Sequence, residues 1–292
     1  MENNKNKYFI LKPKFGSLLR SRLETNNILP LIGIYDVFSA ALVAKKFEAI
    51  FCSGYGFAAS YYGLPDEGYI TWTDMVAYVE RIRAVLPSTH IVVDIDDGYG
   101  DPNIAANIAC RLERVGASAV ILEDQRRPKK CGHLPGKEIL AMEEYMPRLK
   151  AVLDIRENLF VVARTDTVKM SDGIERAQEF ARAGADAILI EGIKDINQLK
   201  IIREAIGVDT LLMINLIAGG KTDPVTLGEL SELGVNMVNY STPCLFAAHK
   251  AIDDTLDRLI KEDGKLIVKK DDITLEKNNK ILKSMLKNAL FR

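Results

Sequence analysis

The sequence predicts a closed (β/α)8 barrel of the TIM type, with residues 1–292 as a single domain. Short apolar runs recur eight times along the chain, and segments with helical periodicity lie between them. No glycine-rich dinucleotide-binding turn follows the first run. Strands that alternate with helices imply parallel strands joined by crossover helices. Eight such units favour a closed barrel over an open doubly wound sheet.

The predicted strands are short runs of mainly aliphatic and β-branched residues, a composition typical of strands that are covered on both faces. They are residues 29–34, 49–53, 90–94, 119–123, 159–164, 187–191, 210–215 and 235–240. The helical segments between them include residues 73–85, 102–115, 173–183, 195–205 and 223–233. Several of these helices end near a glycine that can adopt the left-handed conformation of a helix cap. These glycines are Gly116, Gly184, Gly207 and Gly234.

The last part of the chain, residues 264–292, is predicted to be a C-terminal helical extension of the barrel. Its apolar residues recur at helical spacing and define one face. They are Ile281, Leu282, Met285, Leu286 and Leu290. This face can pack on the chain's own barrel or on a neighbouring subunit, and the spacing favours neither.

The composition excludes several classes of partner. A net charge of -1 gives no general attraction to nucleic acid or to an anionic membrane. No apolar stretch approaches the roughly 20 residues that span a bilayer, and the N-terminus lacks the apolar core of a secretory signal. The four cysteines are scattered and lack metal-finger spacing. We therefore expect a cytoplasmic protein with reduced thiols and a small-molecule substrate.

Polar side chains follow the predicted strands at their carboxyl ends, where barrel enzymes carry their active sites. Carboxylates and an arginine recur there, whereas strand ends that merely meet solvent would carry mixed polar residues. The positions are Tyr35, Asp36, Ser53, Gly54, Asp94, Asp96, Asp97, Glu123, Arg164, Asp166, Glu191, Asn215, Tyr240 and Ser241. The pattern predicts one site to which many strands contribute.

The fourth predicted strand ends at Glu123 and leads into a cationic loop that carries Lys129, Lys130, Cys131 and His133. A thiol beside two lysines and a histidine has a stabilised thiolate and can exchange a proton near neutral pH. This segment indicates an enzyme.

The segment D-I-D-D-G-Y-G at residues 94–100 predicts a metal site. Asp94 and Asp96 project to the same side of a strand, and crowded carboxylates repel one another unless a cation lies between them. Mg²⁺ takes oxygen ligands and keeps several waters, so Glu123 and Glu191 can complete an outer shell through water. For Asp97 the favoured interpretation is a capped, solvated turn before the next helix.

Two further motifs indicate that the site binds a carboxylate. The glycines of S-G-Y-G at residues 53–56 allow backbone N–H groups to approach an anionic oxygen. Asp66 in the following loop is a candidate carboxylate of the same site. In A-R-T-D at residues 163–166, the Arg164 guanidinium can hold a carboxylate through two parallel hydrogen bonds. An internal salt bridge of Arg164 with Glu123 or Glu191 is the alternative.

Over roughly residues 16–260 the chain resembles the isocitrate lyase/phosphoenolpyruvate mutase superfamily, particularly its short lyase branch with 2-methylisocitrate lyase and 2,3-dimethylmalate lyase. The ordered motifs that carry this resemblance are G-I-Y-D-V-F-S-A at 33–40, S-G-Y-G-F-A-A-S at 53–60, G-L-P-D at 63–66, D-I-D-D-G-Y-G at 94–100, E-D-Q at 123–125, P-K-K-C-G-H at 128–133, G-K-E at 136–138, A-R-T-D at 163–166, I-E-G at 190–192 and G-G-K-T at 219–222.

The resemblance implies an enzyme dependent on Mg²⁺, with Mn²⁺ as a substitute, that acts on 2-oxo or 2-hydroxy carboxylates through an enolate-type intermediate. It also implies a homotetramer whose C-terminal helix is exchanged between neighbours. The implied metal site comprises Asp94, Asp96 and Glu123. The implied catalytic residues are Cys131, His133, Lys129, Arg164 and Glu123. The implied substrate-binding residues are Ser53, Gly54, Tyr55, Asp66, Gly132, Arg164, Glu191 and Asn215.

Cys131 favours carbon–carbon cleavage, because mutases and phosphonopyruvate hydrolases typically carry asparagine at that place. The expected reaction splits a methylisocitrate- or substituted-malate-like substrate into pyruvate or glyoxylate and a carboxylate, with Cys131 as the proton donor. The alternatives are an oxaloacetate hydrolase or decarboxylase, and a phosphoenolpyruvate mutase or phosphonopyruvate-processing enzyme. A non-catalytic barrel would be expected to have lost these residues.

Three positions depart from the pattern of the lyases. Phe51 replaces an aromatic hydroxyl, Asp97 stands where threonine or alanine is common and adds negative charge near the metal, and Ala218 stands where relatives often carry glutamate. These departures suggest a substrate other than the usual tricarboxylate.

Overall fold

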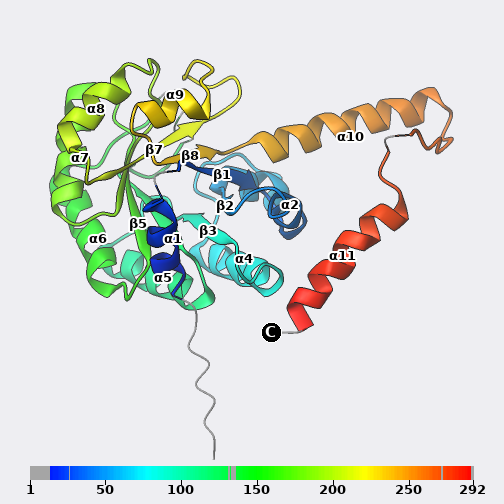
Figure 1. Ribbon diagram of the computed structural model, residues 1–292, viewed down its shortest axis with the longest axis horizontal. Helices are drawn as coiled ribbons and strands as arrows, with labels where there is room; N and C mark the ends of the chain where they lie inside the picture. The colour runs from blue at the N-terminus through cyan, green and yellow to red at the C-terminus, as the bar shows by residue number, and fades with distance from the viewer. Residues whose placement is uncertain (1–13, 26, 131, 133–135, 271, 291–292) are drawn as a thin grey trace, which may run out of the picture.

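The protein is a closed barrel of eight parallel strands, in which each strand pairs with the next and β8 pairs with β1 (Figure 1). The computed structural model describes residues 14–25, 27–130, 132, 136–270 and 272–290. The strands are β1 (Leu29–Ile34), β2 (Ala49–Cys52), β3 (His90–Asp94), β4 (Ala119–Glu123), β5 (Phe160–Thr165), β6 (Ala187–Ile190), β7 (Leu211–Leu216) and β8 (Met237–Tyr240). The predicted fold class is confirmed, and β1, β3 and β4 have the predicted bounds.

The other strand bounds differ from prediction by one or two residues, for local reasons. β2 ends before Ser53, because Ser53 instead caps the next helix by accepting the Gly56 N–H group at 3.2 Å. β8 begins after Asn236, because the Asn236 side chain accepts the Leu212 N–H group at 2.9 Å. A side chain thus takes the place of a ladder hydrogen bond.

Helices cover the outside of the barrel, as the alternating pattern predicts. They are α1 (Phe15–Leu23), α2 (Val37–Val43), α3 (Gly54–Phe57), the π-helix η1 (Ala58–Tyr62), α4 (Trp72–Val85), α5 (Pro102–Val115), α6 (Met142–Ile155), α7 (Met170–Arg182), α8 (Gln198–Ile206), α9 (Leu227–Glu232), α10 (Pro243–Lys261) and α11 (Leu275–Leu290). The helix predicted at residues 223–233 begins only at Leu227, because Thr226 and Glu229 form a capping box in front of it.

The barrel has one core inside the strands and another between strands and helices. Inward-facing residues such as Phe51 and Val162 fill the interior together with Leu19 and Leu23 of α1. Arg20 fixes α1 there by donating to the Leu159 carbonyl at 3.0 Å and to Asp186. One end of the barrel is therefore packed with apolar side chains, which leaves the other end for polar ones.

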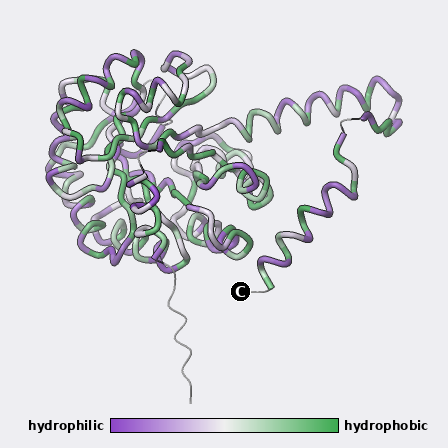
Figure 2. Tube along the Cα trace, viewed as in Figure 1, coloured by the Kyte–Doolittle hydropathy of each residue, from purple (hydrophilic) through white to green (hydrophobic). Residues whose placement is uncertain are grey.

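The chain leaves the barrel along α10 and returns along α11, which ends near α4 (Figure 1). Neither helix has a buried residue among those that the structure describes. α11 contacts α4 and α2, and Asn288 donates to the Val85 carbonyl at 3.0 Å. Hydrophobic and hydrophilic residues alternate along both helices (Figure 2). Within the described residues, no helix has the length and apolar character needed to cross a membrane.

Gly33 lies where β1 approaches β8 and closes the barrel. A methyl group on Gly33 would lie 2.0 Å from the backbone oxygen of Ser241. We expect Gly33→Ala to lower the free energy of unfolding by about 3 kcal/mol, because backbone atoms cannot move aside as a flexible side chain can. Chemical denaturation monitored by circular dichroism measures the change.

Gly228→Ala in α9 is the matched control. The nearest atom to its added methyl group, Thr226 Oγ1, is 3.9 Å away, and alanine is favoured over glycine in a helix. Equal free energies of unfolding for the two variants would show that the close approach of β1 and β8 does not require glycine at position 33.

Candidate active site

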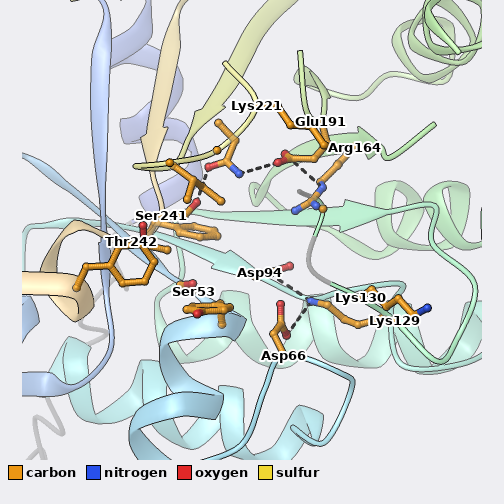
Figure 3. A pocket seen from close by; sticks show the side chains of 18 residues that line it. Ser53, Asp66, Asp94, Lys129, Lys130, Arg164, Glu191, Lys221, Ser241 and Thr242 are labelled. Carbon is orange, nitrogen blue, oxygen red and sulfur yellow. Dashed lines mark hydrogen bonds and ion pairs between the residues drawn. The ribbon is translucent and has the colours of Figure 1, made fainter. Parts of the chain in front are cut away.

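A cavity of about 340 Å³ opens at the carboxyl ends of the strands (Figure 3). Nine residues of the predicted site line it, and they come from segments far apart in the sequence. They are Ser53, Tyr55, Asp66, Asp94, Lys129, Gly132, Arg164, Glu191 and Asn215. The predicted gathering of these side chains at one rim of the barrel is therefore present.

Three further predicted residues, Gly54, Asp96 and Glu123, do not line the cavity but contact residues that do. A methyl group on Gly54 would be 3.3 Å from Asp94 Oδ2 and 3.7 Å from Asp96 Oδ1, so Gly54 lets α3 approach both carboxylates. Glu123 Oε2 lies 3.3 Å from Arg164 Nη2, so Glu123 contacts the site through Arg164. Cys131 and His133 lie outside the described residues.

Three carboxylates surround the ammonium group of Lys129, and Figure 3 shows two of them, Asp66 and Asp94. The Nζ atom lies 3.4 Å from Asp66 Oδ1 and 3.8 Å from Asp94 Oδ2, and it donates a hydrogen bond to Asp96 Oδ1. Burial disfavours the charged amine, but these carboxylates raise the pKa of Lys129 well above its usual value. Lys129 therefore stays cationic near neutral pH and supplies charge rather than a base.

The two predicted metal carboxylates are themselves buried. Asp94 is 7% exposed and Asp96 is 3% exposed. Burial raises the pKa of both carboxyl groups, and the nearby Lys129 ammonium opposes the rise. The Asp96 N–H group donates to Asp94 Oδ1 at 3.1 Å, so the backbone holds the pair together.

Arg164 is the centre of a second charged cluster. Its Nε and Nη2 atoms donate to the two oxygens of Asp166 at 2.8 and 3.0 Å. Nη2 also lies 3.3 Å from Glu123, and Nε lies 3.7 Å from Glu191. The alternative predicted for Arg164, an internal salt bridge, is thus present with both acids. Asp166, predicted only as one of the strand-end residues of the site, is its nearest partner.

Glu123 is fully buried, and within the described part of the chain neither of its carboxylate oxygens has a hydrogen-bond partner. Burial raises the pKa of Glu123 well above its usual value, despite the opposing charges of Arg164 and Lys129. A buried acid without hydrogen bonds is unfavourable unless another ligand satisfies it.

A chain of amide and hydroxyl groups holds Glu191 from the other side. Asn215 Nδ2 donates to Glu191 Oε1 at 2.8 Å. The Asn215 carbonyl oxygen accepts from Asn239 at 3.0 Å and from the Ser241 hydroxyl. Ser241 was predicted only as one of the strand-end residues of the site, and Asn239 was not predicted. Their signal is positional, because Asn239 on β8 and Ser241 just after it are two residues apart, and both contact Asn215 of β7.

Asp97 does not lie in the solvated turn that the sequence favours. It is 3% exposed, and its carboxylate pairs with Arg127 and Arg148, each at 2.8 Å. The expected extra negative charge near the metal site is therefore paired with two cations. The sequence does not show this, because both arginines lie far from Asp97 along the chain.

The described residues fit a divalent ion that keeps much of its water. Among them, no group of three or more His, Cys, Asp or Glu side chains is arranged to hold a metal. Mg²⁺, however, is usually bound by only one or two carboxylates together with waters and substrate oxygens. Asp94 and Asp96 are two such carboxylates, and the Glu123 oxygens are free to accept from a bound water.

Comparisons with known proteins identify relatives of this chain. A family profile described as phosphoenolpyruvate phosphomutase matches residues 19–260. A 2,3-dimethylmalate lyase from Eubacterium barkeri is 33% identical over 272 residues, which cover 90% of this chain and 92% of that protein. A 2-methylisocitrate lyase from Halalkalibacterium halodurans is 36% identical over 252 residues, which cover 84% of this chain and 81% of that protein.

The chain belongs to the phosphoenolpyruvate phosphomutase family. The resemblance to the isocitrate lyase/phosphoenolpyruvate mutase superfamily is confirmed, as is the prediction of an enzyme of the lyase type. Among solved structures, oxaloacetate acetylhydrolase in complex with 3,3-difluorooxalacetate superposes with a TM-score of 0.88 at 28% identity, covering 94% of this chain and 95% of that chain.

We expect the enzyme to bind Mg²⁺ more tightly as the pH rises from mildly acidic to neutral. Because burial raises the pKa values of Asp94, Asp96 and Glu123, protons compete with the ion for these carboxyl groups at higher pH than they would for exposed ones. Calorimetric titration with Mg²⁺ over a pH series measures the effect. Asp94→Asn, which should lose most of the affinity at every pH, is the control, and a pH-independent wild-type affinity would contradict the assignment.

Proposed function

We propose that this enzyme is a Mg²⁺-dependent lyase that cleaves a carbon–carbon bond of a 2-hydroxy di- or tricarboxylate, methylisocitrate-like or substituted-malate-like. The products would be pyruvate or glyoxylate and a second carboxylate, formed through an enolate-type intermediate. The observation that carries the proposal is the gathering of Asp94, Arg164, Lys129 and Gly132 around one cavity. Mn²⁺ is expected to replace Mg²⁺.

In this proposal Asp94 and Asp96 hold the ion and its waters, and Glu123 accepts from one of these waters. The bound ion would lower the pKa of the substrate hydroxyl group. The chain's own contribution is to bury these carboxylates. Exclusion of bulk water strengthens every charge interaction in the site.

We assign the binding of the substrate carboxylate to Arg164, to Ser53 and Tyr55, and to the backbone at Gly54. Two parallel hydrogen bonds that Arg164 donates to Asp166 fix the plane of the guanidinium. A rigid guanidinium loses little entropy when it binds a planar carboxylate. Asp66, Glu191 and Asn215 complete the polar lining of the cavity.

The position of Gly132 supports a role for its loop, residues 129–133, in the reaction. A methyl group on Gly132 would be 2.5 Å from Arg164 Nη2 and 2.6 Å from Glu191 Cγ, so only glycine permits this approach. Lys137 fixes the backbone there by donating to the Gly132 carbonyl at 2.6 Å and to Asp166 at 2.8 Å. We propose that Cys131, polarised by Lys129, Lys130 and His133, donates the proton to the new carbanion.

A hydrolase or decarboxylase acting on oxaloacetate is the second candidate. Oxaloacetate acetylhydrolase, with its TM-score of 0.88, is the observation that favours it. A phosphoenolpyruvate mutase or phosphonopyruvate-processing enzyme is a third candidate, supported by the family profile. A lyase with Cys131 as its proton donor fits the two lyase relatives better.

We also propose that the enzyme is a homotetramer in the cytoplasm and that its C-terminal helical extension, residues 264–292 with α11, is exchanged between subunits. Both α11 and the preceding helix α10 carry large apolar side chains that remain exposed in the single chain. These include Ile252, Leu256, Ile260, Leu282 and Leu286. A second copy of the chain would bury them. Residues 1–292 are treated as a single domain, with 264–292 as its extension.

The substrate class can be tested by incubating the enzyme and Mg²⁺ with 2-hydroxy di- and tricarboxylates, oxaloacetate and phosphonopyruvate. We expect pyruvate or glyoxylate from a 2-hydroxy acid. Cys131→Ser should lower turnover by about 100-fold or more, while Mg²⁺ and pyruvate still bind. Cys110→Ser, in α5, is the matched control. Release of pyruvate from phosphonopyruvate alone, or full activity of Cys131→Ser, would contradict the proposal.

The proposed exchange of the C-terminal extension can be tested by light scattering during gel filtration. The wild-type enzyme should have the mass of four chains. Leu282→Lys with Leu286→Lys should shift the mass to smaller species, because charges then replace apolar side chains in the interface. Lys283→Gln, on the same helix, should leave the mass unchanged. A wild-type mass of one chain would exclude exchange.

A further inference from the structure

The Asp97 carboxylate joins three segments at the rim of the barrel. Its Oδ1 atom accepts the Tyr99 N–H group at 3.1 Å and Arg127 Nε at 2.8 Å. Its Oδ2 atom accepts Arg148 Nη1 at 2.8 Å, and the Asp97 carbonyl accepts the same nitrogen at 2.9 Å. Asp97 thus links the loop after β3 to the loop after β4 and to α6.

Arg127 lies between Asp97 and the proposed metal ligand Asp96. Its Nη2 atom is 3.7 Å from Asp96 Oδ2, whereas its Nε atom is 2.8 Å from Asp97 Oδ1. The guanidinium also lies over the Tyr99 ring, 5.2 Å from the centroid. The contact with Asp97 is the shorter one and has hydrogen-bond geometry. Asp97 is therefore the stronger ion-pair partner of Arg127.

The backbone around Asp97 is held in a conformation that side chains disfavour. Asp96 has a φ angle of +48° and Tyr99 a φ angle of +61°, both in the left-handed region. For a bulky residue such as tyrosine this conformation is costly and needs support from its surroundings. The hydrogen bond from the Tyr99 N–H group to Asp97 supplies part of that support, and the same turn orients Asp96.

Arg127 also belongs to the loop that carries Lys129. Arg127 and Lys129 are two residues apart, and both contact carboxylates of the loop after β3. Without Asp97, the nearest acid to the Arg127 guanidinium would be Asp96. Arg127 and Lys129 both already lie within ion-pair distance of Asp96. Without Asp97, the Arg127 charge would pair more fully with this carboxylate, which a divalent ion needs.

We propose that Asp97 is a positioning residue that takes the shorter contact with Arg127, limits the pairing of Arg127 with Asp96 and so keeps Asp96 available to a divalent cation. This inference rests on the metal role of Asp94 and Asp96 in the proposed function. Asp97 acts only through Arg127 and the turn at Tyr99. Its charge serves as the anion that pairs with Arg127 in place of Asp96.

A double-mutant cycle on the full chain tests the inference, with calorimetric titration of Mg²⁺ alone as the readout. The variants are Asp97→Asn, Arg127→Gln and the two combined. Asparagine keeps an oxygen for the Tyr99 N–H group but loses the charge that pairs with Arg127. Arg126→Gln is the matched control, because Arg126 pairs with the exposed Glu144 away from the site.

We expect Asp97→Asn to weaken Mg²⁺ binding about tenfold, an effect within the usual range for coupled neighbours. Removal of Arg127 should restore about tenfold in the Asp97→Asn background but change affinity about twofold or less in the wild-type background. The effect of Arg127→Gln must differ between the two backgrounds, because charges that act independently at long range would give the same change in Mg²⁺ affinity in both. Arg126→Gln should bind Mg²⁺ as the wild type does.

Three results would overturn this inference but leave the proposed metal site standing. They are unchanged Mg²⁺ affinity in Asp97→Asn, equal effects of Arg127→Gln in both backgrounds, and no recovery of Mg²⁺ affinity in the double variant. Arg127→Gln alone also decides if Asp97→Asn fails to fold, because a large loss of affinity in that single variant would show that Arg127 supports the site. A wild-type enzyme that does not bind Mg²⁺ would instead overturn the proposed metal site itself, and with it this inference.

Discussion

The active site depends on two buried cations that are each paired with three carboxylates. Lys129 lies among Asp66, Asp94 and Asp96, and Arg164 lies among Glu123, Asp166 and Glu191. An unpaired charge at such depth would cost several kcal/mol, so each cation requires its acids and each acid requires a cation. The loops that carry these side chains must therefore dock together.

The barrel makes this docking possible. Parallel strands bring their carboxyl ends to one rim, and α1 helps to fill the opposite end with apolar side chains. Two glycines complete the arrangement: Gly33 allows β1 and β8 to approach, and Gly132 allows its loop to pack on Arg164. The charged clusters thus rest on backbone contacts that larger residues would block.

Much of the fold and part of the site could be predicted from local patterns. The strand containing Asp94 has the predicted bounds, because a short aliphatic run that ends in acids is readable without tertiary information. The pairing of Arg164 was less accessible, because Asp166, Glu123 and Glu191 are all possible partners in the sequence. Only the geometry shows that Asp166 makes the two short hydrogen bonds.

The sequence by itself determined the strand order, the rim that carries the chemistry and the chemical types gathered there, since periodicity and strand-end residues are local properties. Tertiary structure decided which charges meet. Asp97 shows the difference: its neighbours in the chain suggest a solvated turn, yet Arg127 and Arg148 enclose it. Burial and charge pairing depend on segments that meet only after the barrel closes, and no local sequence pattern encodes which of these segments come into contact.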